Sequence, residues 1–312
     1  MDVFVTGATG ALGRLVVQRL FEEGHRVRAL ARSEANAGTL REARVEPVTA
    51  DLFNLDSMTR TVAGSDAVLH LATRIPPAMK VRSRKAWAEN DRIRGIGTRN
   101  VVDAALANGV GTVLYHSFYA VYADGRDRWI EADSSPVDPL WFLETNMEAE
   151  AHIARFASTG GRGISLRMGW FLGLESSQTM ELLGYARHGF AMVPGSSEAY
   201  VPSIWVHDAA EAVVAALRAP SGVYDVVDDE PLTRAEYAEA LAAAVGRKRL
   251  RRPPMFLMRL FAGSAGEAMG RSMRISNRRF KDAAGWAPSV RSAREGYARL
   301  AAGVKADAGR SA

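Results

Sequence analysis

The chain has 312 residues and contains no cysteine. Without cysteine it has no disulfides, no thiolate nucleophile, no iron–sulfur cluster and no cysteine-ligated zinc. Lysine is scarce, since only five of the 40 Lys and Arg residues are lysines. No two of the six histidines stand four residues apart, which excludes a helical His-x3-His face, and we predict no metal site. Few residues are therefore candidates for acid–base chemistry.

Long apolar runs are also missing. No run of about 18 apolar residues free of charge occurs, so we expect no transmembrane helix and no membrane contact. The first predicted strand begins at Val3, which leaves no room for a signal peptide, and we expect a cytoplasmic protein. The net charge is +5, and the basic run 247–252 is more typical of a solvated connector than of a nucleic-acid site.

Predicted strands and helices alternate along the first two thirds of the chain. Strands are predicted at 3–6, 27–30, 45–48, 67–71, 112–115, 163–167 and 223–227, and helices at about 12–21, 55–63, 87–107, 140–157 and 207–217. This order is typical of an α/β, Rossmann-type doubly wound parallel sheet. We predict a dinucleotide-binding domain at 1–167 and 203–229, a small, mostly helical substrate-binding part at 168–202 and 230–302, and a flexible tail at 303–312.

A glycine-rich loop follows the first predicted strand. Gly7 permits a tight turn, Gly10 lets the backbone approach a pyrophosphate, and Gly13 lets helix and strand pack closely. With them, Thr9, Ala11, Leu12 and Arg14 are predicted to surround the phosphates. The second strand ends at Arg32 with no carboxylate to bind a ribose 2′-hydroxyl, and a guanidinium suits a 2′-phosphate. The sequence therefore favours NADP(H) over NAD(H) as cofactor.

These features resemble the extended short-chain dehydrogenase/reductase family, the NAD-dependent epimerase/dehydratase-like group, over about residues 2–302. The matching segments are 6–13, 51–52, 68–72, Asn90 with 97–101, 121–122, 205–210 and 285–288. The resemblance implies that Asp51 and Leu52 lie beside the adenine and that Leu71 and Ala72 line the cofactor. It also implies a homodimer through the two long helices, 87–107 and 140–157.

The family's catalytic tyrosine and lysine are missing from the sequence. The family uses Tyr-x3-Lys, in which the cation lowers the pKa of the phenol, together with a serine or threonine. No tyrosine of this chain has a lysine four residues later. One alignment places Leu140 at the tyrosine, Glu144 at the lysine and Phe118 at the serine. Met168-Gly169 also replaces the family's Pro-Gly turn near the nicotinamide.

Other residues are predicted to supply the acid–base chemistry. Tyr119 is the preferred proton donor, because it directly follows the fifth strand, and Ser117, Glu144 and His116 are the other candidates. An aromatic pocket suited to a flat or apolar small molecule is predicted from Phe118, Trp141, Trp170 and Phe171. Some of these rings are equally compatible with core or dimer packing.

Three functions fit this pattern. The first is an NADP(H)-dependent reductase or dehydrogenase that reduces a carbonyl or enone with a non-standard acid–base residue. The second is a non-redox lyase, isomerase or cyclase in which the cofactor is structural. The third is a catalytically silent dinucleotide-sensing regulator. The aromatic residues favour an enzyme, because a sensor needs no shaped substrate pocket.

Overall fold

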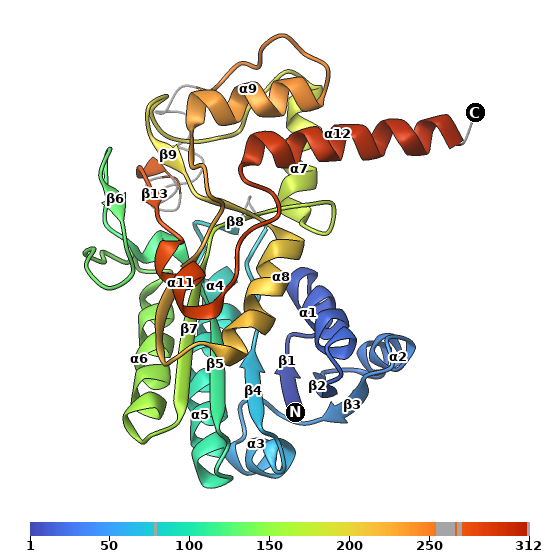
Figure 1. Cartoon of the computed structure of the whole chain (residues 1–312), viewed down its shortest axis with the longest axis vertical. Helices are drawn as coiled ribbons and strands as arrows, with labels where there is room; N and C mark the ends of the chain where they lie inside the picture. The colour runs from blue at the N-terminus through green and yellow to red at the C-terminus, as the bar shows by residue number, and fades with distance from the viewer. Residues whose placement is uncertain (78–79, 254–265, 267–269, 311–312) are drawn as a thin grey trace.

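The computed structural model describes residues 1–77, 80–253, 266 and 270–310, and it is built around a seven-stranded sheet (Figure 1). All neighbouring strands are parallel, and their order is β11-β7-β5-β4-β1-β2-β3. The strands are β1 (Asp2–Thr6), β2 (Arg26–Ala31), β3 (Glu46–Thr49), β4 (Ala67–His70), β5 (Thr112–Phe118), β7 (Arg162–Met168) and β11 (Gly222–Val226). The predicted Rossmann-type doubly wound sheet is confirmed.

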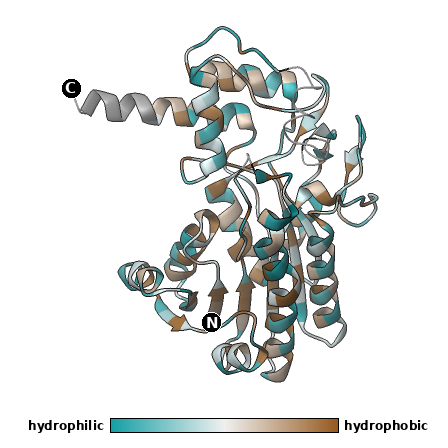
Figure 2. Ribbon diagram, turned by 180° about the vertical axis from the view of Figure 1, so that it is seen from behind, coloured by the Kyte–Doolittle hydropathy of each residue, from teal (hydrophilic) through white to brown (hydrophobic). Residues whose placement is uncertain are grey.

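Helices cover both faces of this sheet. One face packs against α1 (Ala11–Glu22), α2 (Glu34–Glu42) and α8 (Val206–Ala215), and the other against α3 (Leu55–Val62), α5 (Thr98–Ala107) and α6 (Glu144–Ser158). Side chains alternate along β1, where Val3 and Val5 face the first group and Phe4 faces the second. The central strands are therefore apolar on both sides, and Figure 2 shows them as hydrophobic.

The sequence analysis did not predict two of the helices, nor a π-helical turn within a third. The helix predicted at 87–107 begins earlier, as α4 (Arg84–Arg92), passes through a π-helical turn (Ile93–Gly97) and continues as α5. α2 was not predicted, although Ser33 caps it by accepting a hydrogen bond from the Asn36 N–H. α7 (Ser177–Arg187) lies in the part 168–202, for which no individual helix was predicted, and Ser176 caps it in the same way. Both capping serines are sequence signals of a helix start, and the sequence analysis did not use them.

The chain's second half adds a separate core above the sheet. α7, α9 (Arg234–Ala244) and α12 (Ala293–Arg310) share a buried apolar cluster, and Figure 1 shows them beyond the arrowheads of β1 and β4. Smaller elements join the two halves: β6 (Trp129–Ile130) with β13 (Arg274–Ile275), β8 (Trp170–Leu172) with β10 (Ser203–Trp205), β9 (Tyr200–Val201) with β12 (Leu232–Thr233), the 3-10 turns η3 (Tyr119–Val121) and η4 (Ala216–Arg218), and α11 (Arg278–Ala284).

The predicted tail, 303–312, begins within the last helix of the described chain. α12 continues to Arg310, so residues 303–310 are helical, and the alanines around Gly303 favour a helix. Residues 311 and 312 lie outside the described part. Among the described residues, no helix combines the length and the apolar character that crossing a membrane requires.

Candidate functional site: a dinucleotide cavity at the strand ends

The glycine loop between β1 and α1 is closely packed against its neighbours. Gly7 has a φ of +77°, and a Cβ there would lie 2.6 Å from the backbone N of Ala72. A Cβ at Gly13 would lie 2.1 Å from the Gly7 carbonyl oxygen, so only glycine fits. Gly10 caps α1 without a side-chain hydrogen bond, and its N–H donates to the Gly7 carbonyl at 3.0 Å. The N–H groups of the first turn of α1 therefore point at open space beside the loop, as in an anion-binding helix start.

A cavity of about 520 Å³ opens beside this loop at the carboxyl ends of β1 to β4. It is lined by Gly7, Thr9, Gly10, Leu30, Arg32, Asn36, Ala50, Asp51, Leu52, Phe53, Leu71, Ala72, Thr73, Glu89 and Ile93. Eight of the twelve residues predicted to bind cofactor are among them. The volume and the position at the strand ends suit a dinucleotide.

The other four predicted cofactor residues do not line the cavity. Leu12 and Gly13 are buried in the packing of α1 against the sheet, whereas Ala11 and Arg14 lie in the first turn of α1, with Arg14 exposed. The sequence analysis missed several lining residues, among them Asn36, Phe53 and Glu89. Phe53 had an available signal, because it directly follows Asp51 and Leu52. Asn36 lies on α2, which was not predicted, whereas Glu89 lies within the predicted helix 87–107 and had no sequence signal that it lines the cavity.

The end of β2 carries positive rather than negative charge. Arg32 is exposed, and its guanidinium has no ion-pair partner among the residues described. The acidic residues of the lining are Asp51 and Glu89, which come from elsewhere in the chain. Asp51 is occupied locally, because its Oδ1 accepts a hydrogen bond from the Phe53 N–H at 2.9 Å. Arg32 therefore remains the group best placed for an added phosphate.

Two histidines, buried His70 and half-buried His116, lie at the carboxyl ends of β4 and β5. His70 Nδ1 lies 2.6 Å from Thr6 Oγ1, and Nε2 lies 3.4 Å from the Ile93 carbonyl, which only accepts. Nε2 therefore carries the proton, and the Thr6 hydroxyl donates to Nδ1. Burial lowers the pKa of His70 to about 4, so this neutral ring links β1, β4 and the π-helical turn. That link holds the backbone leading into Leu71 and Ala72.

The second histidine, His116, is held neutral by its surroundings. It stacks on Phe171 with ring centroids 5.6 Å apart. Burial first, and then the charge of Arg94, lower the pKa of His116 to about 3. Its Nδ1 has no hydrogen-bond partner within the described residues. At neutral pH His116 has no imidazolium proton to give, which weakens the prediction that it is an acid.

Ser117 faces the interior rather than the strand-end crevice. It is fully buried, and its hydroxyl donates to Glu150 Oε1 at 2.6 Å. Glu150 also forms a bidentate, buried ion pair with Arg167 at 2.9 and 2.7 Å. The guanidinium of Arg167 lies 4.7 Å from the ring centre of Tyr122, whose hydroxyl donates to Asp225 at 2.8 Å. Ser117 is thus part of a core network beneath the sheet surface.

The face of α6 that points inward differs from the one that the family alignment predicted. Glu144 is exposed in the first turn of α6, whereas Asn146, Ala149, Glu150, Ile153 and Phe156 form the buried face. The inward-facing positions at a spacing of four are therefore Asn146 and Glu150, preceded by buried Phe142, and not Leu140 and Glu144. α6 contains neither tyrosine nor lysine. Glu144 stays a predicted catalytic residue, and it lies exposed in the first turn of α6, away from the buried face of that helix.

Tyr119 lies where the sheet meets the C-terminal part. It follows β5 directly, is buried, and its ring centroid lies 4.5 Å from that of Phe118. Burial raises the pKa of Tyr119 above its ordinary value, against the opposing charge of Arg234, and Tyr237 adds to the rise. The phenol therefore keeps its proton through the neutral range and faces α9.

The four predicted pocket aromatics occupy two places. Phe118, Trp141 and Trp170 are half-buried and pack against one cluster with Tyr119 and Phe142, whereas half-buried Phe171 packs against the main core. Trp170 Nε1 is buried and lacks a hydrogen-bond partner in the described part of the chain. These rings are thus partly buried in the packing of the core, which the sequence analysis gave as an alternative to a substrate pocket.

The comparisons with known proteins agree with this fold and cavity, which define a dinucleotide-binding α/β protein. The sequence profile of the NAD dependent epimerase/dehydratase family matches residues 3–227. The 3-diazoavenalumate denitrifying reductase of a Streptomyces species is 28% identical over 317 residues, covering 96% of this chain and 100% of the relative. The 2-alkyl-3-oxoalkanoate reductase of Stenotrophomonas maltophilia is 28% identical over 267 residues, covering 80% of this chain and 77% of the relative.

A solved structure extends the match to the whole chain. The human epimerase family protein SDR39U1, crystallised with NADPH, superposes with a TM-score of 0.81 at 22% identity, over 97% of this chain and 99% of that one. The chain belongs to the NAD dependent epimerase/dehydratase family, the extended short-chain dehydrogenases/reductases. The resemblance noted in the sequence is confirmed, and it shows binding of a nicotinamide dinucleotide, for which the cavity at the glycine loop is the candidate site.

Proposed function

We propose that this protein is an NADP(H)-dependent reductase or dehydrogenase that acts on a carbonyl or enone of a flat or apolar small molecule. The observation that carries the proposal is the cavity at the glycine loop, which has Arg32 and no carboxylate at the end of β2. The names of two relatives, both reductases, support it, as does the NADPH bound to the human family member. When bound, the nicotinamide supplies or takes up the hydride.

The protein's own residues would orient the cofactor and exclude water. The first turn of α1 would bind the pyrophosphate, and Arg32 the 2′-phosphate. His70 holds the strand ends in place through Thr6 and Ile93. The half-buried rings Phe118 and Trp170 would give an apolar substrate its contact surface. These roles need no charged group except at the phosphates.

We assign to Tyr119 the delivery of the proton to the substrate. Ser117 donates into the core and His116 carries no imidazolium proton at neutral pH. Tyr119 holds its proton and lies at the end of β5, with Arg234 as the cationic group facing it. Arg234 would stabilise a phenolate formed after proton transfer, which is the part that a lysine plays in the family pattern.

The cofactor assignment is tested by titrating the purified chain with NADPH and NADH and following fluorescence. We expect NADPH to bind more tightly, and Arg32→Ser to remove that preference while leaving NADH affinity nearly unchanged. Arg44→Ser, at another exposed arginine outside the cavity, is the matched control. A preference for NADH in the unmodified chain would contradict the assignment.

The proton donor is tested with aromatic ketones and enones as candidate substrates. With an active substrate, Tyr119→Phe should lower kcat by roughly 100-fold or more, since general acid catalysis contributes on that scale. Tyr185→Phe, which alters an exposed tyrosine on α7, should leave kcat unchanged. Equal turnover of Tyr119→Phe and the unmodified chain would show that another group delivers the proton.

A dinucleotide-sensing regulator is the second candidate. It is favoured by one observation: the position beneath β5 is filled by the Ser117–Glu150–Arg167 network, and α6 has no tyrosine or lysine. This function predicts tight NADPH binding with no oxidation in the presence of any ketone or enone, and a partner protein retained in pull-down experiments. A non-redox lyase or isomerase would instead convert substrate with the cofactor spectrum unchanged.

A further inference from the structure

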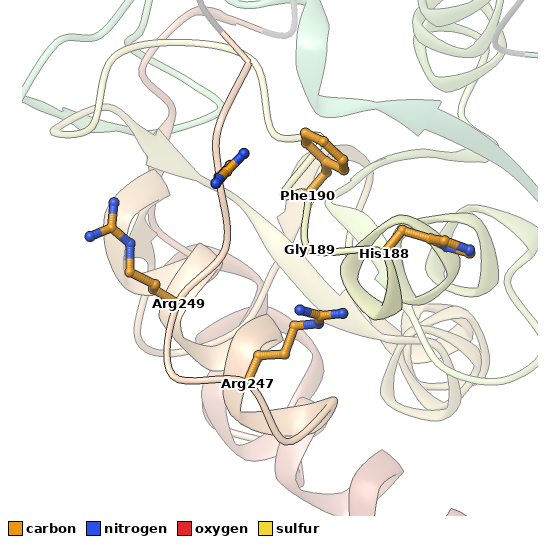
Figure 3. Close-up of a pocket in the computed structure, with 6 residues that line it drawn as sticks. His188, Gly189, Phe190, Arg247 and Arg249 are labelled. Carbon is orange, nitrogen blue, oxygen red and sulfur yellow. The ribbon is translucent and has the colours of Figure 1, made fainter.

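A second cavity lies in the C-terminal part, between α7 and the segment that follows α9. Its volume is also about 520 Å³, and it is lined by His188, Gly189, Phe190, Arg247, Arg249 and Arg251 (Figure 3). It shares no lining residue with the dinucleotide cavity. Three of its six lining residues are arginines and none is acidic. The charged residues that line the cavity are therefore all positive.

Backbone pairing fixes the arginines in place. The Arg251 N–H donates to the Gly189 carbonyl at 2.9 Å, and the Ala191 N–H donates to the Arg251 carbonyl at 2.9 Å, so this segment runs beside Phe190 as a parallel bridge. Side chains alternate along such extended backbone. Leu250 packs toward the C-terminal core, and Arg252 donates to Ser197 and to the Gly195 carbonyl. Arg249 and Arg251 are consequently placed on the opposite, cavity side.

The structure therefore changes the reading of the basic run 247–252, which by sequence alone is typical of a solvated connector. Arg247 is anchored, because its Nη2 donates to the Arg187 carbonyl at the end of α7 at 2.6 Å. The guanidiniums of Arg249 and Arg251, in contrast, have no hydrogen-bond or ion-pair partner among the described residues. The guanidiniums of Arg249 and Arg251 lie near that of Arg247 and have no carboxylate to balance their charge. An anion bound between them would therefore reduce their mutual repulsion.

The cavity also has an apolar wall. Phe190 is 42% exposed, and Figure 3 shows its ring among the residues that line the cavity. Gly189 has a φ of +92°, and this left-handed turn brings Phe190 round to pair with Arg251. His188 donates from Nδ1 to the Gly184 carbonyl at 2.9 Å, which leaves its Nε2 available to a ligand.

We propose that this cavity binds a phosphate-bearing small molecule, with Arg249 and Arg251 on the phosphate and the Phe190 ring against an apolar or aromatic group of the ligand. Guanidinium forks match phosphate oxygens in pairs, and a ring beside them selects an organic phosphate over the inorganic ion. The volume of the cavity lies in the range of small-molecule sites, which favours such a ligand over a nucleic-acid backbone. The site is independent of the reductase assignment, and its test needs no turnover.

The experiment is calorimetric titration of the full chain with phenyl phosphate and with inorganic phosphate at low ionic strength. Phenyl phosphate should bind saturably, and the double variant Arg249→Gln/Arg251→Gln should bind it roughly tenfold or more weakly, because charge-assisted hydrogen bonds are lost. Phe190→Ala should weaken phenyl phosphate and leave inorganic phosphate unchanged. Arg187→Gln/Lys248→Gln removes the same charge nearby without touching the lining, and should bind like the unmodified chain.

Three results would overturn the proposal. One is the absence of saturable phenyl phosphate binding to the unmodified chain. Another is equal weakening in the lining and the control double variants, which would mean that net charge alone attracts the anion. The third is binding of duplex DNA with an affinity that grows with duplex length, while phenyl phosphate binds weakly and without saturation, since that identifies a nucleic-acid surface.

Discussion

The buried carboxyl group of Asp225 allows a test of how burial changes a pKa and, through it, the pH dependence of the free energy of unfolding. It lies on β11, is 2% exposed, and accepts hydrogen bonds from the Tyr122 hydroxyl at 2.8 and 3.0 Å. Burial raises the pKa of Asp225 from 3.8 to about 7, against the lowering by the Tyr122 hydrogen bond and by Arg167; Glu150 raises it and Arg279 lowers it. The folded protein therefore holds this proton more tightly than the unfolded chain does.

The sign and size of the pH effect follow from that difference. Below pH 3.8 the carboxyl is protonated in both states and burial of its charge costs nothing. Between pH 3.8 and about 7 the unfolded chain releases the proton first, so the free energy of unfolding falls as the pH rises. About three pKa units, at about 1.4 kcal/mol each, give a total loss of roughly 4 kcal/mol above the folded pKa.

Asp225→Asn removes the titration and keeps an acceptor for Tyr122. Urea unfolding followed by tryptophan fluorescence at pH 5 and pH 8 measures the free energy of unfolding of both proteins. Relative to the unmodified chain, the variant should be more stable at pH 8 than at pH 5 by roughly 2.5 kcal/mol. Because any pH-independent effect of the amide cancels in this comparison, the change with pH isolates the carboxyl.

The exposed Asp127 supplies the control. Asp127→Asn should shift the unfolding free energy by less than about 0.5 kcal/mol, and equally at both pH values, as surface substitutions do. If the difference between Asp225→Asn and the unmodified chain is the same at pH 5 and pH 8, Asp225 is already ionised in the folded state. The network would then carry a full negative charge beside Tyr122, and the reasoning from burial would be refuted.

Three further predictions concern the cofactor site and assembly. Gly13→Ala should destabilise the fold by several kcal/mol and abolish NADPH binding, because its Cβ would meet the Gly7 carbonyl, whereas Gly38→Ala in α2 has open space and should be neutral or slightly stabilising in thermal unfolding. Arg32→Glu should reverse the preference from NADPH to NADH in fluorescence titrations, and retained NADPH preference would contradict the assigned role. A homodimer through α4–α5 and α6 predicts twice the chain mass in sedimentation equilibrium, and a monomer at all concentrations would exclude it.

The sequence analysis worked best where a local pattern determines the structure. The run from Thr6 to Gly13 requires a strand, a tight turn and a helix within a few residues, and the structure shows why, since Gly7 and Gly13 admit no Cβ. The central strands were equally accessible, because strands buried on both faces read as continuous apolar runs. The π-helical turn at Ile93–Gly97 had no such pattern: its two glycines lower the helix propensity but do not by themselves distinguish a π-helical from an α-helical turn.

Side-chain direction was the part that sequence could not provide. Aligning Glu144 with the family's lysine placed it toward the cofactor, but α6 turns Asn146 and Glu150 inward instead. A shift of two residues on a helix changes direction by about 200°, so a small error in alignment moves a residue to the opposite face. The ion pair of Glu150 with Arg167 joins residues from different elements, so no local sequence pattern predicts it.

The buried network limits where a proton donor for the proposed reaction can lie. Along β5, Ser117 points toward α6, and its hydroxyl is committed to Glu150, so the inner face of the strand offers no free acid. His116, on the opposite face, is half-buried, and it stays neutral because desolvation of its ring and then the charge of Arg94 lower its pKa. The next candidate along the chain is Tyr119, which turns toward α9 and Arg234. In the proposed reaction the proton donor therefore lies in the C-terminal part above the sheet rather than on the helix beneath it. A loss of activity in Arg234→Gln that parallels the loss in Tyr119→Phe would support that location.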